Sequence, residues 1–231
     1  MKLSDLLQRI KIAVPNMNET GVENTYLTEL FNQACNDFLL LTKVWVTSTD
    51  FNIVAEQQEY ELSTIVPTYL GTAKEGLFFL NSSSKWKDII PKTKAWISEM
   101  YPDFLNATST AVPKWYYTEG DTLGFHPKPS TDQTEGGKLF HLKKSVNMSG
   151  NDDFPFSGDA SKEITAFIPA DDALIAYVRW KLSPAFGQVT DQDVREREYL
   201  NECRKAAKQI KRRRDLTHDS DYRLTLWSRH F

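Results

Sequence analysis

The period of the hydrophobic pattern changes twice along this 231-residue chain, and this change constrains the fold more than any other sequence feature. Apolar residues recur at helical spacing near both ends, whereas they alternate with polar residues in the middle. A helix buries one stripe and a strand buries one face. The pattern therefore predicts an α+β protein, with a helical bundle from the N- and C-terminal helices, a central antiparallel β lobe and an extended C-terminal tail.

Four helices are predicted from the 3.6-residue period, over about residues 3–10, 22–43, 170–183 and 190–214. Pro15 stops the first of them, and the apolar stripe of the second ends at Leu41. The last helix has a thin apolar stripe that consists of Val194, Leu200, Cys203, Ala207 and Ile210. We expect the helices from the two ends of the sequence to pack on each other.

About seven strands are predicted from the period of two. Hairpins are expected over residues 49–62, 76–90 and 114–126, a further strand over 138–143, and a short helix over 94–101. The best-marked hairpin turns at Glu119-Gly120-Asp121 and is closed by Pro127 and Pro129.

Four segments follow from these elements: the N-terminal helices over 1–43, a β-rich lobe over 44–163, the C-terminal helices over 164–214 and the tail over 215–231. Near the end of the lobe segment, residues 146–162 are rich in Asn, Asp, Ser and Gly around Phe154-Pro155-Phe156. This composition is typical of an exposed loop that carries an aromatic anchor.

Seven positive charges fall within eleven residues of the last helix, at Arg204, Lys205, Lys208, Lys211, Arg212, Arg213 and Arg214. Such a run can follow phosphates, face an acidic protein surface or form a solvated helix face. Three consecutive arginines cannot share one helix face at about 100° per residue, which favours an interface around the helix end. With a net charge of −3, the whole chain is not typical of a nucleic-acid binder, so any such contact is expected at this local run.

The tail beyond this run carries large apolar side chains, namely Tyr222, Leu224, Leu226, Trp227 and Phe231. An aromatic side chain can bury about 150–250 Å² and is costly to leave in water. Two interpretations stay open: the tail binds a partner, or it folds back as a strand on its own domain.

Motifs for enzymatic chemistry are absent from the sequence, including glycine-rich phosphate loops, G-x-S-x-G, H-E-x-x-H and C-x-x-C. His126 and His141 are expected on neighbouring strands, but two imidazoles without a third ligand make a weak metal site. We expect no catalytic residue, no metal and no cofactor. Cys35 and Cys203 are expected to be buried thiols in a reducing compartment.

The sequence contains no apolar run of about 18 residues, and charges interrupt its N-terminal segment where a signal peptide would be apolar. We therefore expect a soluble protein made in the cytoplasm, without membrane contact.

The order of these features resembles the head-to-tail adaptor proteins of tailed bacteriophages, especially the short-tailed type. The resemblance covers most of the chain through these segments: Tyr26-Leu27-Thr28-Glu29-Leu30, residues 55–62, Pro113-Lys114-Trp115-Tyr116-Tyr117, residues 123–129, Asp153-Phe154-Pro155-Phe156, Ile168-Pro169 and residues 172–178. It implies a structural, non-enzymatic protein of the virion neck.

In such a protein a ring of about twelve copies lies between the portal protein and a tail or nozzle protein, and its lumen passes DNA in transient contact. The resemblance implies that the C-terminal segment docks on the portal. We assign portal binding to Arg212, Arg213, Arg214, Tyr222, Leu224, Leu226, Trp227 and Phe231.

Complementary faces are expected between neighbouring subunits of a ring, since they meet head to tail. We name the loop over residues 146–162 the acidic loop and the helix over 190–214 the basic helix. We assign the subunit interface to Asp152, Asp153, Phe154 and Phe156 in the acidic loop and to Lys208 and Lys211 in the basic helix. The alternative function is a nucleic-acid-binding accessory protein that acts through the basic C-terminal helix.

Overall fold

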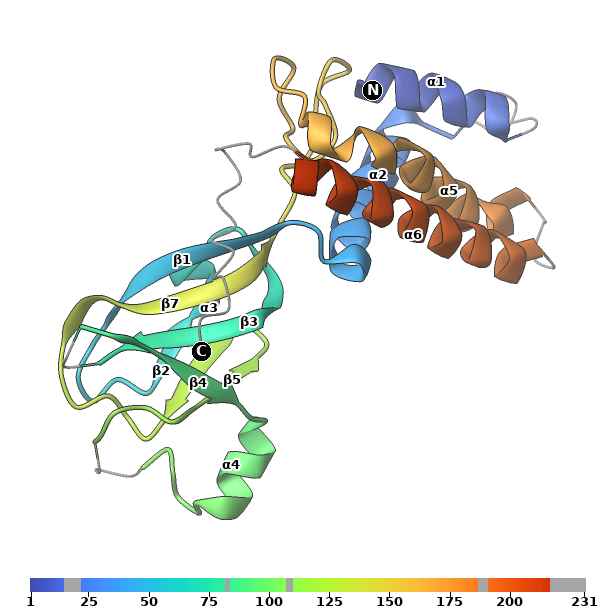
Figure 1. Ribbon diagram of the computed structural model, residues 1–231. Helices are drawn as coiled ribbons and strands as arrows, with labels where there is room; N and C mark the ends of the chain where they lie inside the picture. The colour runs from blue at the N-terminus through green and yellow to red at the C-terminus, as the bar shows by residue number, and fades with distance from the viewer. Residues whose placement is uncertain (15–21, 82–83, 107–109, 187–190, 217–231) are drawn as a thin grey trace. The chain divides into compact units, whose positions relative to one another are not determined.

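The computed structural model describes residues 1–14, 22–81, 84–106, 110–186 and 191–216, and it divides into two compact units. One unit is helical and contains residues 1–45 together with the described part of 144–231, and the other is β-rich and contains residues 46–143 (Figure 1). The predicted α+β class is confirmed, with N- and C-terminal helices packed together and a seven-stranded sheet formed by the middle of the chain.

The helical unit is built around α5, which packs against α1, α2 and α6 (Figure 1). Side chains on nearly every face of α5 are buried, which is typical of a central helix. The elements of this unit are α1 (Leu3–Ala13), α2 (Asn24–Thr42), η1 (Thr165–Ala170), α5 (Asp171–Leu182), η2 (Ser183–Phe186) and α6 (Gln192–Leu216). All four predicted helices are therefore present.

Two asparagines of α2 attach the segment that follows the sheet to the helical unit. The Asn36 side chain accepts hydrogen bonds from the backbone and the hydroxyl of Ser145, at 3.1 and 2.8 Å. Asn32 both accepts from and donates to the backbone of Met148, at 2.8 and 3.0 Å. Residues 144–163, which the sequence pattern grouped with the β lobe, thus belong to the helical unit.

The β-rich unit contains one sheet with the strand order β1-β7-β3-β4-β5-β6-β2. All pairs are antiparallel except β4 with β5, which is parallel. Its elements are β1 (Val46–Ile53), β2 (Glu59–Glu61), α3 (Leu62–Ile65), β3 (Tyr69–Leu80), β4 (Trp86–Pro91), α4 (Lys94–Met100), β5 (Trp115–Glu119), β6 (Thr122–His126) and β7 (Gln133–Lys143).

The sheet is curled, because its two outermost strands contribute to one core. Phe51 of β1 and Tyr60 of β2 are buried in contact, with ring centroids 5.8 Å apart. Phe125 of β6 completes this aromatic group, at 5.5 Å from Tyr60. Strands that are far apart in the sheet order therefore share one hydrophobic core.

The predicted hairpin over residues 49–62 is wrong, whereas those over 76–90 and 114–126 are confirmed. Strand β1 pairs with β7, and β2 pairs with β6. The backbone between β1 and β2 forms hydrogen bonds with other segments. The amide of Glu56 donates to the carbonyl of Pro129, and the amide of Ala55 donates to the side chain of Asp132. Alternation shows which residues face the core, but it does not identify the partner strand.

A partly buried hydrogen bond joins α6 to α2. The Tyr199 hydroxyl donates to the Asp37 carboxylate at 2.6 Å, and the tyrosine is only 1% exposed. Its ring stacks against Trp180 at a centroid distance of 5.9 Å and meets Tyr177 edge-on at 5.2 Å. Burial and the bond to Asp37 raise the pKa of Tyr199, so the hydroxyl keeps its proton and remains a donor.

A second network ties α4 to the sheet. The carboxylate of Glu59 on β2 accepts hydrogen bonds from the Tyr117 hydroxyl at 2.5 Å and from Lys94 at 3.2 Å. Lys94 also pairs with Glu119 at 3.3 Å. The bond from Tyr117, followed by that from Lys94, lowers the pKa of Glu59. The charged form of Glu59 thus stabilises the position of α4.

We predict that Tyr199→Phe destabilises the chain by about 1–3 kcal/mol, because the partly buried Asp37 carboxylate loses its donor. Tyr26→Phe on the exposed side of α2, where the side chain is 49% exposed, should change stability by less than about 0.5 kcal/mol. Urea unfolding of both variants checks this, and equal midpoints would contradict the structural role of the bond.

We predict that the stabilisation by Glu59 is lost in acid. Its pKa is lowered on folding, so its contribution is complete above the ordinary value of 4.5 and disappears as the pH falls through the folded value. The difference in unfolding free energy between wild type and Glu59→Gln should therefore shrink below about pH 4.5. Urea titrations at several pH values measure it, with Glu75→Gln at an exposed position of β3 as control. A difference that stays constant would refute the assignment.

Candidate functional site

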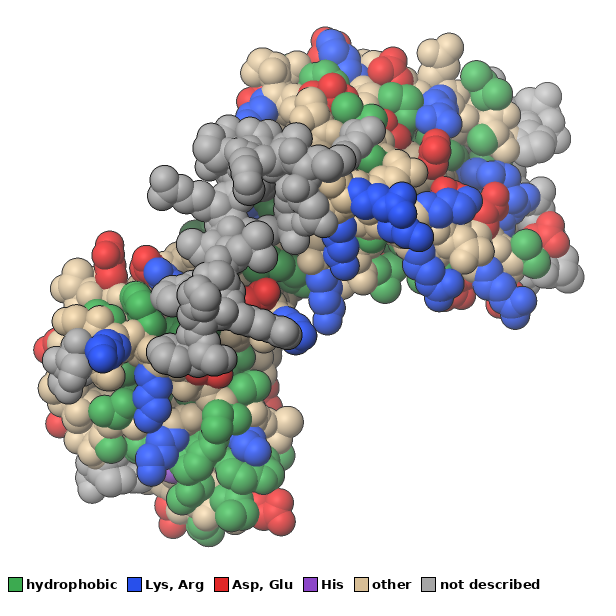
Figure 2. Space-filling view, viewed as in Figure 1, with side chains coloured by type: hydrophobic (Ala, Val, Ile, Leu, Met, Phe, Trp, Pro, Cys, Tyr) green, Lys and Arg blue, Asp and Glu red, His purple; other side chains and the backbone are tan. Residues whose placement is uncertain are grey.

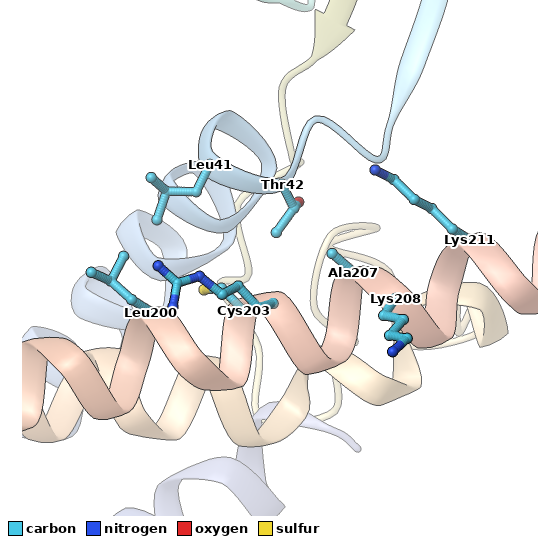
Figure 3. A pocket seen from close by; sticks show the side chains of 8 residues that line it. Leu41, Thr42, Leu200, Cys203, Ala207, Lys208 and Lys211 are labelled. Atoms are coloured by element: carbon cyan, nitrogen blue, oxygen red, sulfur yellow. The ribbon is translucent and has the colours of Figure 1, made fainter.

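A groove of about 560 Å³ lies between the end of α2 and the middle of α6 (Figure 3). Leu41 and Thr42 come from α2, and the remaining lining residues come from α6. The α6 residues are Leu200, Cys203, Arg204, Ala207, Lys208 and Lys211. The groove thus combines an apolar lining with three basic side chains.

The groove exists because the buried stripe of α6 differs from the predicted one. Tyr199 and Ala206 are buried together with Cys203 and Ile210, whereas Val194, which was predicted in the stripe, is 59% exposed. Leu200 and Ala207 are only partly buried and line the groove. The small side chains of Cys203 and Ala207 leave space beside the helix.

The prediction for α2, which forms the opposite wall of the groove, also differs from the structure. Leu41 was predicted to end the buried stripe of α2, but it is 49% exposed, and Leu39 is buried in the core instead. Lys43 caps the helix in the left-handed conformation with φ of 51°, so α2 ends directly after the groove residues. An exposed leucine at this helix end is what gives the groove its second apolar wall.

Among the described residues, the basic side chains at the groove have no acidic partner. Within the described ranges, Arg204, Lys208 and Lys211 form no ion pair, whereas the neighbouring Lys205 pairs with Glu202 at 2.7 Å. Figure 2 shows Lys and Arg side chains in a row over α6. The groove is therefore a site of uncompensated positive charge that favours an anionic ligand or protein segment.

The acidic loop presents two of its carboxylates outward. The Asp152 side chain is 72% exposed and pairs with Lys2 at 2.9 Å. Asp159 is also exposed, and its carboxylate accepts hydrogen bonds from the backbone and the hydroxyl of Ser161, both at 2.8 Å. These bonds lower the pKa of Asp159, so it stays ionised.

Asp153 instead holds the loop together. Its carboxylate accepts hydrogen bonds from the backbone amides of Ser149 and Gly150, each at 2.7 Å. The bond from Gly150, followed by that from Ser149, lowers the pKa of Asp153. Its carbonyl also accepts from the amide of Leu3 at 2.8 Å, which ties the loop to α1.

The two phenylalanines of the acidic loop also differ in how far they are buried. Phe156 is 1% exposed and packs against Phe38 and Phe167, with ring centroids 5.8 and 4.6 Å away, so it is the aromatic anchor of its own chain. Phe154 is half-buried, and the Lys2 ammonium lies 5.9 Å from its ring. Of the two, only Phe154 is partly exposed and can contact a neighbouring molecule.

The residues assigned to portal binding lie at the end of α6 and beyond it. The helix continues through the three arginines to Leu216, and Arg212 is exposed. The other residues of the assignment, Tyr222, Leu224, Leu226, Trp227 and Phe231, lie outside the described residues.

His126 and His141 do not form a site together. His126 lies on β6 and His141 on β7, and strands β3, β4 and β5 separate them, so the prediction of neighbouring strands is wrong. Burial lowers the pKa of both imidazoles. His141 is fully buried beside the Thr49 hydroxyl at 3.1 Å. In the described part of the chain, no three His, Cys, Asp or Glu residues are placed to hold a metal ion.

Sequence reasoning missed Arg204, Leu41 and Leu200 as parts of the groove. The signal was present in α6, where positions 200, 204, 207, 208 and 211 share one helix face at spacings of three and four residues. The contribution of α2 had no local signal, because it depends on how the two helices pack.

Comparisons with known proteins agree with a structural role. The model of one protein family, described as SU10 adaptor protein, matches residues 1–224. No curated protein matches the chain. Among the described helices, none is long and apolar enough to cross a membrane. Because the family match extends over nearly the whole chain, the protein belongs to the SU10 adaptor proteins, a family of bacteriophage head–tail adaptors with a structural role.

Proposed function

We propose that this adaptor forms a closed ring of about twelve copies between the portal and the tail of the virion. The C-terminal segment docks on the portal, a tail or nozzle protein binds on the other side, and DNA passes through the lumen in transient contact. Family membership supports the structural role, and the observation that carries the assembly is the apolar groove between α2 and α6, whose cations have no acidic partner among the described residues.

Neighbouring copies meet through this groove and the acidic loop. Lys208 and Lys211 lack acidic partners within the described part of their own chain, and the carboxylates of Asp152 and Asp159 are exposed. Leu41 and Leu200 supply apolar area that the exposed part of Phe154 can cover. Charge complementarity determines how the two copies align, while the burial of apolar surface contributes affinity.

The portal contact is formed by the end of α6 and the residues after it. Arg212 to Arg214 are three consecutive basic residues in the part of the sequence that forms the end of α6. The tail then offers alternating large apolar residues from Tyr222 to Leu226 and two terminal aromatics. An extended segment of this kind binds by adding to a partner's sheet edge and filling pockets with its aromatic anchors.

Nucleic-acid binding through α6 is the second candidate, because the same unpaired cations could follow phosphates. The apolar wall of the groove favours the protein contact, since leucines contribute nothing to phosphate recognition. The two functions differ in salt dependence: affinity for nucleic acid falls linearly in log salt with the number of phosphates that the protein neutralises.

We predict that Lys208→Glu with Lys211→Glu prevents ring formation, because two attractions to the acidic loop become repulsions. Lys87→Glu, at an exposed position of β4, is the control and should leave ring formation unchanged. The combination of Lys208→Glu with Asp152→Lys should restore part of the assembly that Lys208→Glu alone removes. Native mass spectrometry with the portal measures copy number, and rings formed by the Lys208/Lys211 variant would exclude this contact.

We predict that a chain lacking Asp215–Phe231 folds normally but no longer joins the portal. Helices α1, α2 and α5 and the sheet retain their described contacts without the tail, so circular dichroism should be unchanged. Arg212, Arg213 and Arg214 changed together to Ala should weaken portal binding more than folding. Co-purification with the portal measures both effects, and normal incorporation of the truncated chain into particles would refute tail docking.

A further inference from the structure

The β-rich unit carries an exposed surface of aromatic and aliphatic side chains that the proposed subunit and portal contacts leave unused. We name it the α4 surface, and it consists of Ile90, Met100 and Tyr101, which are exposed, and of Trp96 and Trp115, which are partly buried. Ile90 and Met100 are each 55% exposed, and Tyr101 is 36% exposed. Figure 2 shows hydrophobic side chains gathered over α4. Exposed apolar groups that cluster in this way mark interaction sites.

These five side chains form one continuous surface. Trp96 on α4 and Trp115 on β5 have ring centroids 5.9 Å apart, and Tyr101 lies 5.4 Å from Trp115. Met100 lies one turn beyond Trp96 on the same helix face. Ile90 is paired with Trp115 in the β4–β5 register, which places the two residues side by side.

A buried layer holds the surface rigid from below. His126 is 7% exposed and stacks under Trp115, with centroids 5.8 Å apart and planes at 16°. Tyr101 lies 4.5 Å from the same imidazole, and Phe104 meets it edge-on at 5.9 Å. Because this layer positions the Trp115 indole in the free chain, a partner loses little ordering entropy on binding it.

Two lysines add positive charge to the surface. The Lys92 ammonium lies 4.3 Å from the centroid of Trp96, and the Lys114 ammonium lies 6.0 Å from that of Trp115. Neither forms an ion pair within the described ranges, in contrast to Lys94, which pairs with Glu59 and Glu119. The α4 surface therefore offers hydrophobic area together with two cations that are free to meet carboxylates.

We propose that the α4 surface binds an apolar, carboxylate-bearing segment of another protein of the virion. A protein segment fits better than nucleic acid, because Ile90 and Met100 offer aliphatic area that bases cannot use for stacking. A contact with the apolar groove of a second copy is disfavoured, because that groove is itself lined by cations that would repel Lys92 and Lys114. This inference does not depend on the ring contact proposed above.

Photo-crosslinking in assembled particles tests the proposal. The photoreactive residue benzoylphenylalanine replaces Met100 in the full chain, and a second variant carries it at Ile90 on another part of the surface. Both should crosslink to the same peptide of a different virion protein, one with apolar residues and Asp or Glu, identified by mass spectrometry. Adding Lys92→Glu and Lys114→Glu should lower the crosslink yield about tenfold.

The matched control carries benzoylphenylalanine at Val54, which is apolar and 44% exposed in the same unit but is not part of the α4 surface. Circular dichroism and thermal midpoints of the purified variants report their folding. Crosslinks to another copy of this chain, crosslinks to DNA, or a yield no higher than at Val54 would each overturn the proposal. If the crosslink yield does not fall when Lys92 and Lys114 are changed to Glu, the proposal that the partner carries carboxylates is wrong.

Discussion

The hydrogen bond from Tyr199 to Asp37 fixes how α6 lies on α2, and the candidate site depends on that placement. A stripe of small side chains such as Cys203 and Ala206 allows the helices to slide, because small groups interlock weakly. A buried hydroxyl with one acceptor permits far fewer arrangements. With Tyr199 facing inward, the helical period places Leu200, Arg204 and Lys208 along the groove that Leu41 and Thr42 of α2 also line.

The charge of the groove limits how copies of this chain can meet. An isologous contact would bring Arg204, Lys208 and Lys211 of one copy toward the same residues of the next, with no described carboxylate at the groove to compensate them. A contact through this groove must therefore be heterologous and use a different, acidic surface of the neighbour. Heterologous contacts produce closed rings or open filaments, and a ring follows when the rotation between copies closes.

The sequence predicted the elements well because each depends on local periodicity. The helices, the hairpin at Glu119-Gly120-Asp121 and the strand that contains Leu139 all follow from spacing and turn residues. Strand partners did not follow, because β1 joins a strand about ninety residues away and alternation carries no information about such distances. Only one side of the groove could be predicted from the sequence. The residue spacing of α6 defines the helix face that lines the groove, whereas the exposure of Leu41 depends on tertiary packing.

Adjacent residues of the acidic loop have opposite roles, and this preorganises the loop for contact. Backbone amides of the loop hold the Asp153 carboxylate and aromatic rings of the core hold Phe156, so a fixed backbone presents their neighbours Asp152 and Phe154. Phe156 has a positive φ of 69°, a conformation that costs a bulky residue energy and that its packing in the core offsets. The loop is thus already ordered in the folded chain. A partner that binds Asp152 therefore loses no free energy to ordering the loop on binding.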